Sequence, residues 1–229
     1  MGGGKIRLGV AKLPAVEPTV RVTEIFRSIQ GESTRAGFPC VFIRLTGCSL
    51  RCVWCDTAYA FSGGQEMQVA DAAEKVLALG TELVEVTGGE PLEQEGVYPL
   101  MEKLLDRGKT VLLETGGHIP LDRVDPRVVK IVDVKAPGSG MMDANLPENL
   151  ENLGSRDEIK FVLADRRDFD WALDFVAVRD LDQKHVVTFS PVWEKLSAAD
   201  LGSWIRDSGR PIRLGLQLHK LLWGDVPGR

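Results

Sequence analysis

The sequence lacks the features that mark several large classes of protein. It has no run of eighteen apolar residues, which argues against a membrane-spanning helix. Lys and Arg form no stripe and the formal net charge is −5, whereas proteins that bind nucleic acid directly are usually basic. Residues 1–15 contain no long apolar segment of the signal-peptide kind. We therefore expect a cytoplasmic protein that acts on a small molecule or a protein partner.

Cysteine and histidine are also scarce, and the cysteines are unevenly placed. The chain has four cysteines and three histidines, and three of the cysteines lie in the stretch TGCSLRCVWCDTAYAF. Clustered cysteines in a reducing cytoplasm indicate a metal site or catalysis more often than disulfides. The histidines form no ligand-spaced pair, and Cys40 falls within an expected strand, where a small buried residue is typical. The loop therefore offers three thiols with C-x3-C-x2-C spacing: Cys48, Cys52 and Cys55.

Strand-like and helix-like segments alternate along the chain, without internal repeats. The expected strands are 21–26, 40–45, 82–86, 109–115, 128–134, 157–163, 185–190 and 211–217, and the expected helices are 69–80, 96–108, 168–180 and 198–209. This order predicts βαβ units and an α/β fold. A full eight-fold barrel typically needs ~250 residues. This chain is shorter and its first segments are used for something else, so we expect a partial, reduced (βα)6-like barrel with a mostly parallel sheet of about six strands. Residues 1–18 are expected to be an N-terminal lead and residues 19–229 a single domain.

Each candidate motif directly follows an expected strand. The motifs are the cysteine loop, VTGGEP (86–91), ETGG (114–117) and DVKAPGSG (133–140). Ligands in parallel α/β sheets bind at the carboxyl ends of the strands. The motifs are therefore expected to meet at one edge of the sheet.

Three thiols suit an iron–sulfur cluster better than a structural zinc ion, which usually takes four ligands. A cubane held by three thiolates leaves one iron open to an exogenous ligand, much as a catalytic metal keeps an open position. A zinc site completed by a histidine or by Cys40 is the alternative.

The segment CSLRCVWC, with an aromatic residue before its last cysteine, resembles the cluster loop of radical S-adenosylmethionine (SAM) enzymes. The resemblance implies a 4Fe-4S cluster on the three cysteines, with SAM on the open iron. Reductive cleavage of SAM would then yield a 5′-deoxyadenosyl radical. VTGGEP resembles the superfamily's glycine-rich turn. Further SAM contacts are implied at Gly89, Asp133, Val134 and Lys135.

Other segments narrow the resemblance to one family. EIFRSIQGES, FIRLTGC, WCDTAYAF, VLLETGG and QLHKLLWG together resemble 7-carboxy-7-deazaguanine synthases over most of the chain, and IQGE with CDT is the most specific pair. The resemblance implies a lyase that converts 6-carboxy-5,6,7,8-tetrahydropterin to 7-carboxy-7-deazaguanine and releases ammonia. This reaction lies on the route to queuosine, a tRNA modification, and other 7-deazapurines. The implied steps are hydrogen abstraction from C6 and a magnesium-assisted ring contraction.

The family's residue roles transfer to matching positions. Substrate contacts are implied for Ile29, Gln30, Gly31, Arg44, Thr87, Gln217 and His219. The fork of an arginine suits a substrate carboxylate. Glu114 and Glu32 are implied as catalytic residues. Trp54, Cys55 and Asp56 resemble a SAM-contacting triplet, and Thr57 resembles a Mg²⁺ ligand whose shell the substrate completes.

The resemblance also implies a flavodoxin or ferredoxin as reductant and a homodimer. Three other functions stay open at this point. A glycyl-radical-enzyme activase shares the cluster loop and the glycine turn, but it has no need of IQGE, CDT or QLHK. A ferredoxin-like electron carrier conflicts with the long βα pattern. A zinc-stapled scaffold without activity requires the missing fourth ligand.

Overall fold

The computed structural model describes residues 17–226 and 228, so most of the expected N-terminal lead lies outside the described part. The strands are β1 (Thr19–Ile29), β2 (Pro39–Leu45), β3 (Gln65–Gln68), β4 (Leu83–Gly88), β5 (Thr110–Thr115), β6 (Val129–Asp133), β7 (Glu158–Leu163), β8 (Val186–Pro191) and β9 (Ile212–Leu214). They form one sheet in the order β3-β1-β2-β4-β5-β6-β7-β8-β9. From β2 to β9 all neighbours are parallel, while β1 pairs antiparallel with β2 and β3.

The α/β fold with a mostly parallel sheet is therefore confirmed, and the sheet is open. The expected number of about six strands is too low. The antiparallel strands β1 and β3 extend one edge of the sheet, and the three-residue strand β9 extends the other. β3 was not predicted, because its sequence QEMQ has no buried side chain to give it a strand pattern.

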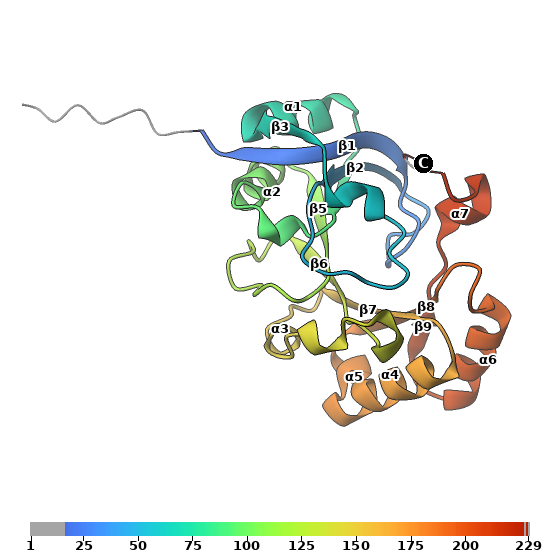
Figure 1. The fold of residues 1–229 in the computed structure, drawn as a ribbon. Coiled ribbons are helices and arrows are strands. Elements are labelled where there is room, and N and C mark those ends of the chain that lie inside the picture. Colours follow the sequence, from blue (N-terminus) through green and yellow to red (C-terminus); the bar gives the residue numbers. More distant parts are fainter. Residues whose placement is uncertain (1–16, 227, 229) are drawn as a thin grey trace, which may run out of the picture.

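The helices lie on the outer side of this sheet, except for the last one, which lies at the carboxyl ends of the strands (Figure 1). They are α1 (Val69–Ala78), α2 (Val97–Asp106), α3 (Glu148–Glu151), α4 (Arg166–Arg179), α5 (Leu181–Lys184), α6 (Ala198–Ser208) and α7 (Leu218–Trp223), with short 3₁₀ turns η1 (Ala58–Phe61), η2 (Pro91–Glu93), η3 (Pro137–Ser139) and η4 (Met142–Ala144). The four expected helices are α1, α2, α4 and α6. No helix in the described residues is long and apolar enough to cross a membrane.

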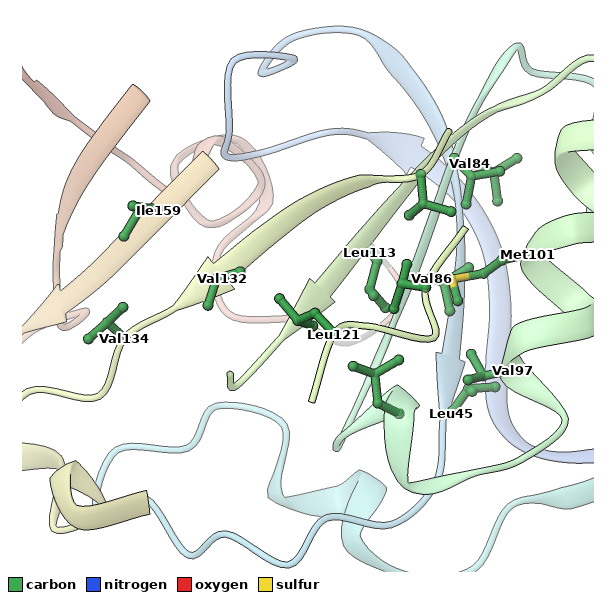
Figure 2. Close-up of a cluster of buried hydrophobic side chains, with 14 of the residues drawn as sticks. Leu45, Val84, Val86, Val97, Met101, Leu113, Leu121, Val132, Val134 and Ile159 are labelled. Atoms are coloured by element: carbon green, nitrogen blue, oxygen red, sulfur yellow. The ribbon is translucent and has the colours of Figure 1, made fainter. Parts of the chain in front are cut away.

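Alternate residues of each strand face the helices and form the main core. In β4, Val84 and Val86 belong to this core together with Met101 of α2. Figure 2 shows part of it, with Leu45 and Leu113 gathered near the same helix. Each fully buried aliphatic side chain stabilises the fold by about 1.5–3 kcal/mol relative to exposure, so this outer face holds the sheet and helices together.

The inner face of the strands, which is the one turned away from the helices, is apolar only toward the amino ends of the strands. A second buried cluster there consists of Cys40, Leu83, Leu112, Val129 and Ile131, with Phe42 packed against it. Cys40 is completely buried and a free thiol, as the sequence predicted. Toward the carboxyl ends of the strands this inner face becomes polar, and that is where the candidate site lies.

Candidate active site

A cavity of about 560 Å³ opens at the carboxyl ends of the strands. It is lined by every residue predicted for the site except Val134, whose side chain is buried in the main core. The side chain of Val134 therefore does not face the cavity, and a SAM contact at this residue stays a prediction. The backbone N–H of Val134 is also engaged, because it donates to the carbonyl of Lys160 at 2.8 Å.

The cysteine loop is held in place at both ends by backbone hydrogen bonds. The Gly47 N–H donates to the Ala60 carbonyl (2.8 Å), and the Val53 N–H donates to the Ser139 carbonyl in the loop after β6 (3.0 Å). Gly47 has a φ of +102°, a conformation that glycine adopts without strain. The three loop cysteines are half-buried free thiols that line the cavity.

The three thiols fit an iron–sulfur cluster better than a single ion. No group of three His, Cys, Asp or Glu side chains in residues 17–226 and 228 is arranged to hold one metal ion. In a cubane each thiolate binds a different iron atom, so the sulfurs stand farther apart than the ligands of one ion. Burial raises the pKa of the Cys48 thiol to about 11, so iron binding there displaces a proton.

The glycine-rich turn packs directly on the cluster loop. A Cβ on Gly89 would collide with the carbonyl of Gly47 and lie 2.9 Å from Cβ of Cys48. The Glu90 N–H donates to the same Gly47 carbonyl at 2.7 Å. Only glycine allows this approach, which leaves the Gly89 backbone at the cavity wall as the SAM prediction requires.

Two buried carboxylates fix these loops, and neither was predicted. Glu90 accepts hydrogen bonds from the Thr115 hydroxyl (3.0 Å) and the Gly116 N–H (2.8 Å), which ties the glycine turn to the end of β5. Asp168 of α4 accepts from the Gly138 N–H (2.8 Å), which fixes the loop after β6. That loop also carries a short ion pair, 2.9 Å, between Lys135 Nζ and Asp133 Oδ2.

Farther into the cavity, three glutamates and one lysine meet on the inner face. Lys160 of β7 pairs with Glu32 Oε2 at 2.9 Å and also contacts Glu114 of β5. Glu85 of β4 accepts a hydrogen bond from the side-chain amide of Gln30, and both residues are almost completely buried. Neither Lys160 nor Glu85 is among the residues predicted from the sequence. The available signal was a charged residue at an interior position of each of the buried apolar strands EIKFVL and LVEV.

The three carboxylates differ in proton affinity. Burial raises the pKa of Glu32, but the ion pair with Lys160 and a hydrogen bond from Gln217 outweigh it, and the net pKa is lowered. Burial raises the pKa of Glu114 more than Lys160 lowers it. Burial and the charges of Glu114 and Glu32 raise the pKa of Glu85 well above its ordinary range. Environments that separate pKa values in this way are typical of acid–base sites.

Arg44 is not a surface arginine, because its side chain lies in the cavity wall. Its Nε donates to Glu24 Oε1 at 2.8 Å, and the Tyr59 hydroxyl donates to the same oxygen at 2.8 Å. The two terminal nitrogens of Arg44 have no hydrogen-bond partner among the described residues. They are therefore available for an anionic group in the cavity.

The C-terminal helix α7 closes one side of the cavity against the IQGE segment. The Leu218 N–H donates to the Gly31 carbonyl at 3.0 Å, and a Cβ on Gly31 would collide with the ring of His219. The Gln217 side chain donates to Glu32 at 2.9 Å. The structure therefore brings the predicted C-terminal residues to the same cavity as IQGE.

The same segment also holds Asp56 of the CDT motif. Lys220 of α7, whose side chain is buried, pairs with Asp56 Oδ2 at 3.0 Å, and Gln217 donates to the same oxygen at 3.2 Å. Burial raises the pKa of Asp56, but Lys220 outweighs it and the net pKa is lowered. Asp56 thus joins the cluster loop to the C-terminal helix, and Lys220 is a further site residue that was not predicted from the sequence.

Comparison with known proteins agrees with this geometry. Residues 42–132 match the family model described as the radical SAM superfamily. The 7-carboxy-7-deazaguanine synthase of Chlorobaculum tepidum is 45% identical over 212 residues, covering 91% of this chain and 96% of that protein. The synthase of Koribacter versatilis is 45% identical over 219 residues, covering 89% and 97%. The crystal structure of QueE from Escherichia coli matches with a TM-score of 0.72 at 25% identity, covering 88% of this chain and 95% of that one.

Similarity of this extent goes beyond a shared fold. The structure of TYW1, at 14% identity and a TM-score of 0.57, shows the fold alone. The two curated synthases, in contrast, are 45% identical and align with about nine-tenths of the chain. This chain is a radical SAM protein of the kind that binds a 4Fe-4S cluster and SAM, and it belongs to the 7-carboxy-7-deazaguanine synthase family.

Proposed function

We propose that the chain is a lyase that converts 6-carboxy-5,6,7,8-tetrahydropterin into 7-carboxy-7-deazaguanine and ammonia, in the synthesis of queuosine and other 7-deazapurines. The relatives that cover most of its length carry the name of this enzyme. The observation that carries the proposal is that one cavity contains both the three-cysteine loop and the Gln30–Glu32–Glu114 group. A glycyl-radical-enzyme activase has no need of the second group.

The cluster would be held by the three loop cysteines, and SAM would lie against Gly89, Trp54, Asp133 and Lys135. When bound, the cluster and SAM supply the 5′-deoxyadenosyl radical that takes the hydrogen from C6 of the pterin. The protein supplies orientation: Gly89 lets the glycine turn pack directly against the cluster loop, and Asp168 holds the loop after β6 in place.

Arg44 would bind the substrate carboxylate. Its Nε is already fixed by Glu24, so the guanidinium is oriented before the ligand arrives, and its terminal nitrogens can donate two parallel hydrogen bonds. Its register partner across β2 and β4 is Thr87, which lines the same wall and offers a hydroxyl to the substrate.

Glu32 and Glu114 would have different roles toward the pterin ring. Glu32 has a lowered pKa, stays ionised at neutral pH and can accept hydrogen bonds from the pterin N–H groups. Glu114 has a raised pKa and can give or take a proton during loss of ammonia. Ile29, Gln30, Gly31 and His219 would complete the wall around the ring.

Mg²⁺ would be held by the Thr57 hydroxyl together with substrate oxygens and water. Thr57 lines the cavity, and its hydroxyl lies 3.7 Å from the sulfur of Cys55. One hydroxyl is a weak magnesium site alone, because this ion keeps several waters and uses substrate oxygens. Its occupancy is therefore expected to depend on the pterin.

The remaining expectations are part of the same proposal. They are a flavodoxin or ferredoxin reductant, a homodimer, a cytoplasmic location and a single radical SAM domain over residues 19–229. The continuous sheet from β3 to β9 supports the single domain.

The decisive experiment uses anaerobically reconstituted protein with SAM, dithionite and 6-carboxy-5,6,7,8-tetrahydropterin. We expect 7-carboxy-7-deazaguanine and 5′-deoxyadenosine, measured by mass spectrometry, and a SAM-dependent change in the spectrum of the reduced cluster. Modification of a protein glycine without the deazapurine would favour the activase. Tightly bound zinc without iron would exclude radical chemistry.

A further inference from the structure

Lys160 occupies an unusual position for a charged residue. It lies in the middle of β7, its residue exposure is 8%, and it is not part of the cavity wall. The carboxylates that it contacts, Glu32 and Glu114, both line the cavity. Lys160 therefore contacts both acids without itself forming part of the cavity wall.

Its two partners come from distant parts of the chain. Glu32 follows β1 and is 128 residues away, whereas Glu114 lies at the end of β5 and is 46 residues away. Lys160 is the residue that joins these two segments across the inner face. Gln217 donates to the other oxygen of Glu32, so that carboxylate is held on both sides.

The surroundings of Lys160 are rich in acids. Its pKa is raised well above the ordinary range, because the charges of Glu114, Glu32 and Asp133 outweigh burial, so it stays protonated. The titratable and charged groups that face Lys160 or Glu32 are Glu32, Glu85, Glu114, Asp56, Asp133, Lys135 and His219. Lys135 is already paired with Asp133. Lys160 is therefore the cation that balances Glu32 and Glu114.

We propose that Lys160 is a positioning residue, which holds the Glu32 and Glu114 carboxylates toward the pterin and keeps Glu32 charged for the pterin N–H groups. Without this cation, three buried carboxylates would share the inner face, and buried carboxylates without a partner take up protons near neutral pH. A protonated Glu32 has lost acceptor capacity. This inference rests on the proposed function.

The test compares Lys160→Met with Lys160→Arg in reconstituted enzyme between pH 6.5 and 9. The measured quantities are KM and kcat for the tetrahydropterin and the Kd of 6-carboxypterin, which has no hydrogen at C6. Each value is divided by the wild-type value at the same pH. This ratio removes the pH effect that comes from ionisation of the ligand, because that effect is the same for both enzymes. For Lys160→Met we expect KM and Kd ratios of about ten at pH 6.5 that fall toward one by pH 9, since each pKa unit changes the charged fraction about tenfold.

Lys160→Arg keeps the charge, so its ratios are expected to be independent of pH. Lys130→Met is the matched control, because Lys130 is also buried and pairs with Asp157 at 2.9 Å, but it lies on the helix-facing side of β6 in register with Leu113. It should lower the unfolding temperature and leave both ratios flat. If Lys160→Met does not fold, Lys160→Gln keeps hydrogen-bond donors without charge and should show the same pH dependence.

A pH-independent ratio for the uncharged variants, or a ratio below twofold at pH 6.5, would overturn the role of Lys160. A wild-type enzyme that makes no deazapurine and binds no 6-carboxypterin would instead overturn the proposed function. The two failures are therefore distinguishable.

Discussion

The two faces of the sheet have opposite chemistry, although alternate residues of the same strands form them. In β4, Val84 and Val86 pack against helices, whereas Glu85 and Thr87 line the cavity. In β7, Phe161 lies in the aromatic core, with Phe189 at a ring-centroid distance of 5.3 Å, whereas Lys160 joins two acids on the other side. Because side chains alternate between the two faces of a strand, a shift of one residue in strand register would turn the apolar side chains toward the cavity and the polar ones toward the helices.

The difference shows where stability and function are separated in this molecule. Burying carboxylates on the inner face costs free energy, because charged groups lose water. Apolar packing on the outer face offsets that cost at positions that no ligand touches. Changes on the inner face should therefore alter binding and catalysis, and changes on the outer face should alter stability.

The largest expected effect on function comes from the cysteine loop, at the edge of the inner face. Cys48→Ala removes one of three cluster ligands, so we expect loss of iron and turnover at background level, with an unchanged unfolding temperature of the apoprotein. Iron content and product formation are the measurements. Cys40→Ala is the matched control, because Cys40 is buried in the second apolar cluster outside the cavity wall, and its loss should leave iron content unchanged. Equal iron loss in both variants would contradict the assignment.

The largest expected effect on stability comes from the outer face. Phe161→Ala leaves a cavity between β7 and α4, where Phe161 also meets Trp171 and Phe175. We expect the free energy of unfolding to fall by about 3–5 kcal/mol, measured by urea denaturation. KM for the pterin in the folded fraction should change less than twofold. Val178→Ala, at an exposed position of α4, should have no measurable effect.

Glu85→Leu tests the inner face without touching the ion pair of Lys160. The Gln30 amide loses its acceptor, and an unsatisfied buried donor costs about 1–3 kcal/mol. We expect a rise in KM for the pterin, while Glu85→Gln, which still offers an acceptor oxygen, should recover part of the affinity. An unchanged KM in Glu85→Leu would show that the orientation of Gln30 does not matter for binding.

The raised pKa of Glu85 also predicts how the stability of the protein depends on pH. Its folded-state pKa is raised well above the ordinary glutamate value of 4.5, so the folded protein keeps a proton that the unfolded chain releases. Its contribution is therefore fully favourable below pH 4.5 and is lost as pH rises toward the folded-state pKa. The stability of Glu85→Gln relative to the wild type should increase from pH 4.5 to pH 8. A constant difference in urea midpoints over this range would mean that Glu85 is ionised in the folded state.

The smallest expected effect is at Thr57, at the edge of the inner face. Thr57→Ala should lower the apparent affinity for magnesium about tenfold, and leave cluster assembly intact. Activity is measured over a magnesium titration, with Thr19→Ala at an exposed position of β1 as control. A magnesium response identical to that of the wild type would remove Thr57 from the proposed metal site.

Much of the fold and part of the site could be predicted from the sequence. The strands β2 and β4 to β8 follow from apolar, β-branched runs, and the three cysteines follow from local spacing. Glu85 and Lys160 were missed because each is an isolated interior position in a largely apolar strand. One charged residue produces no periodic signal in the sequence, and its function depends on which side chains face it in the folded protein.

The sequence alone determined that three thiols lie within eight residues at the end of a strand, because loop spacing is a local property of the chain. It also determined which strands are buried, through their composition. Only the tertiary structure decided that Lys160 joins Glu32 and Glu114, that Lys220 holds Asp56, and that Val134 faces the core. These contacts join residues that are far apart in sequence or depend on which face of a strand turns inward, and both are set by the packing of the whole sheet.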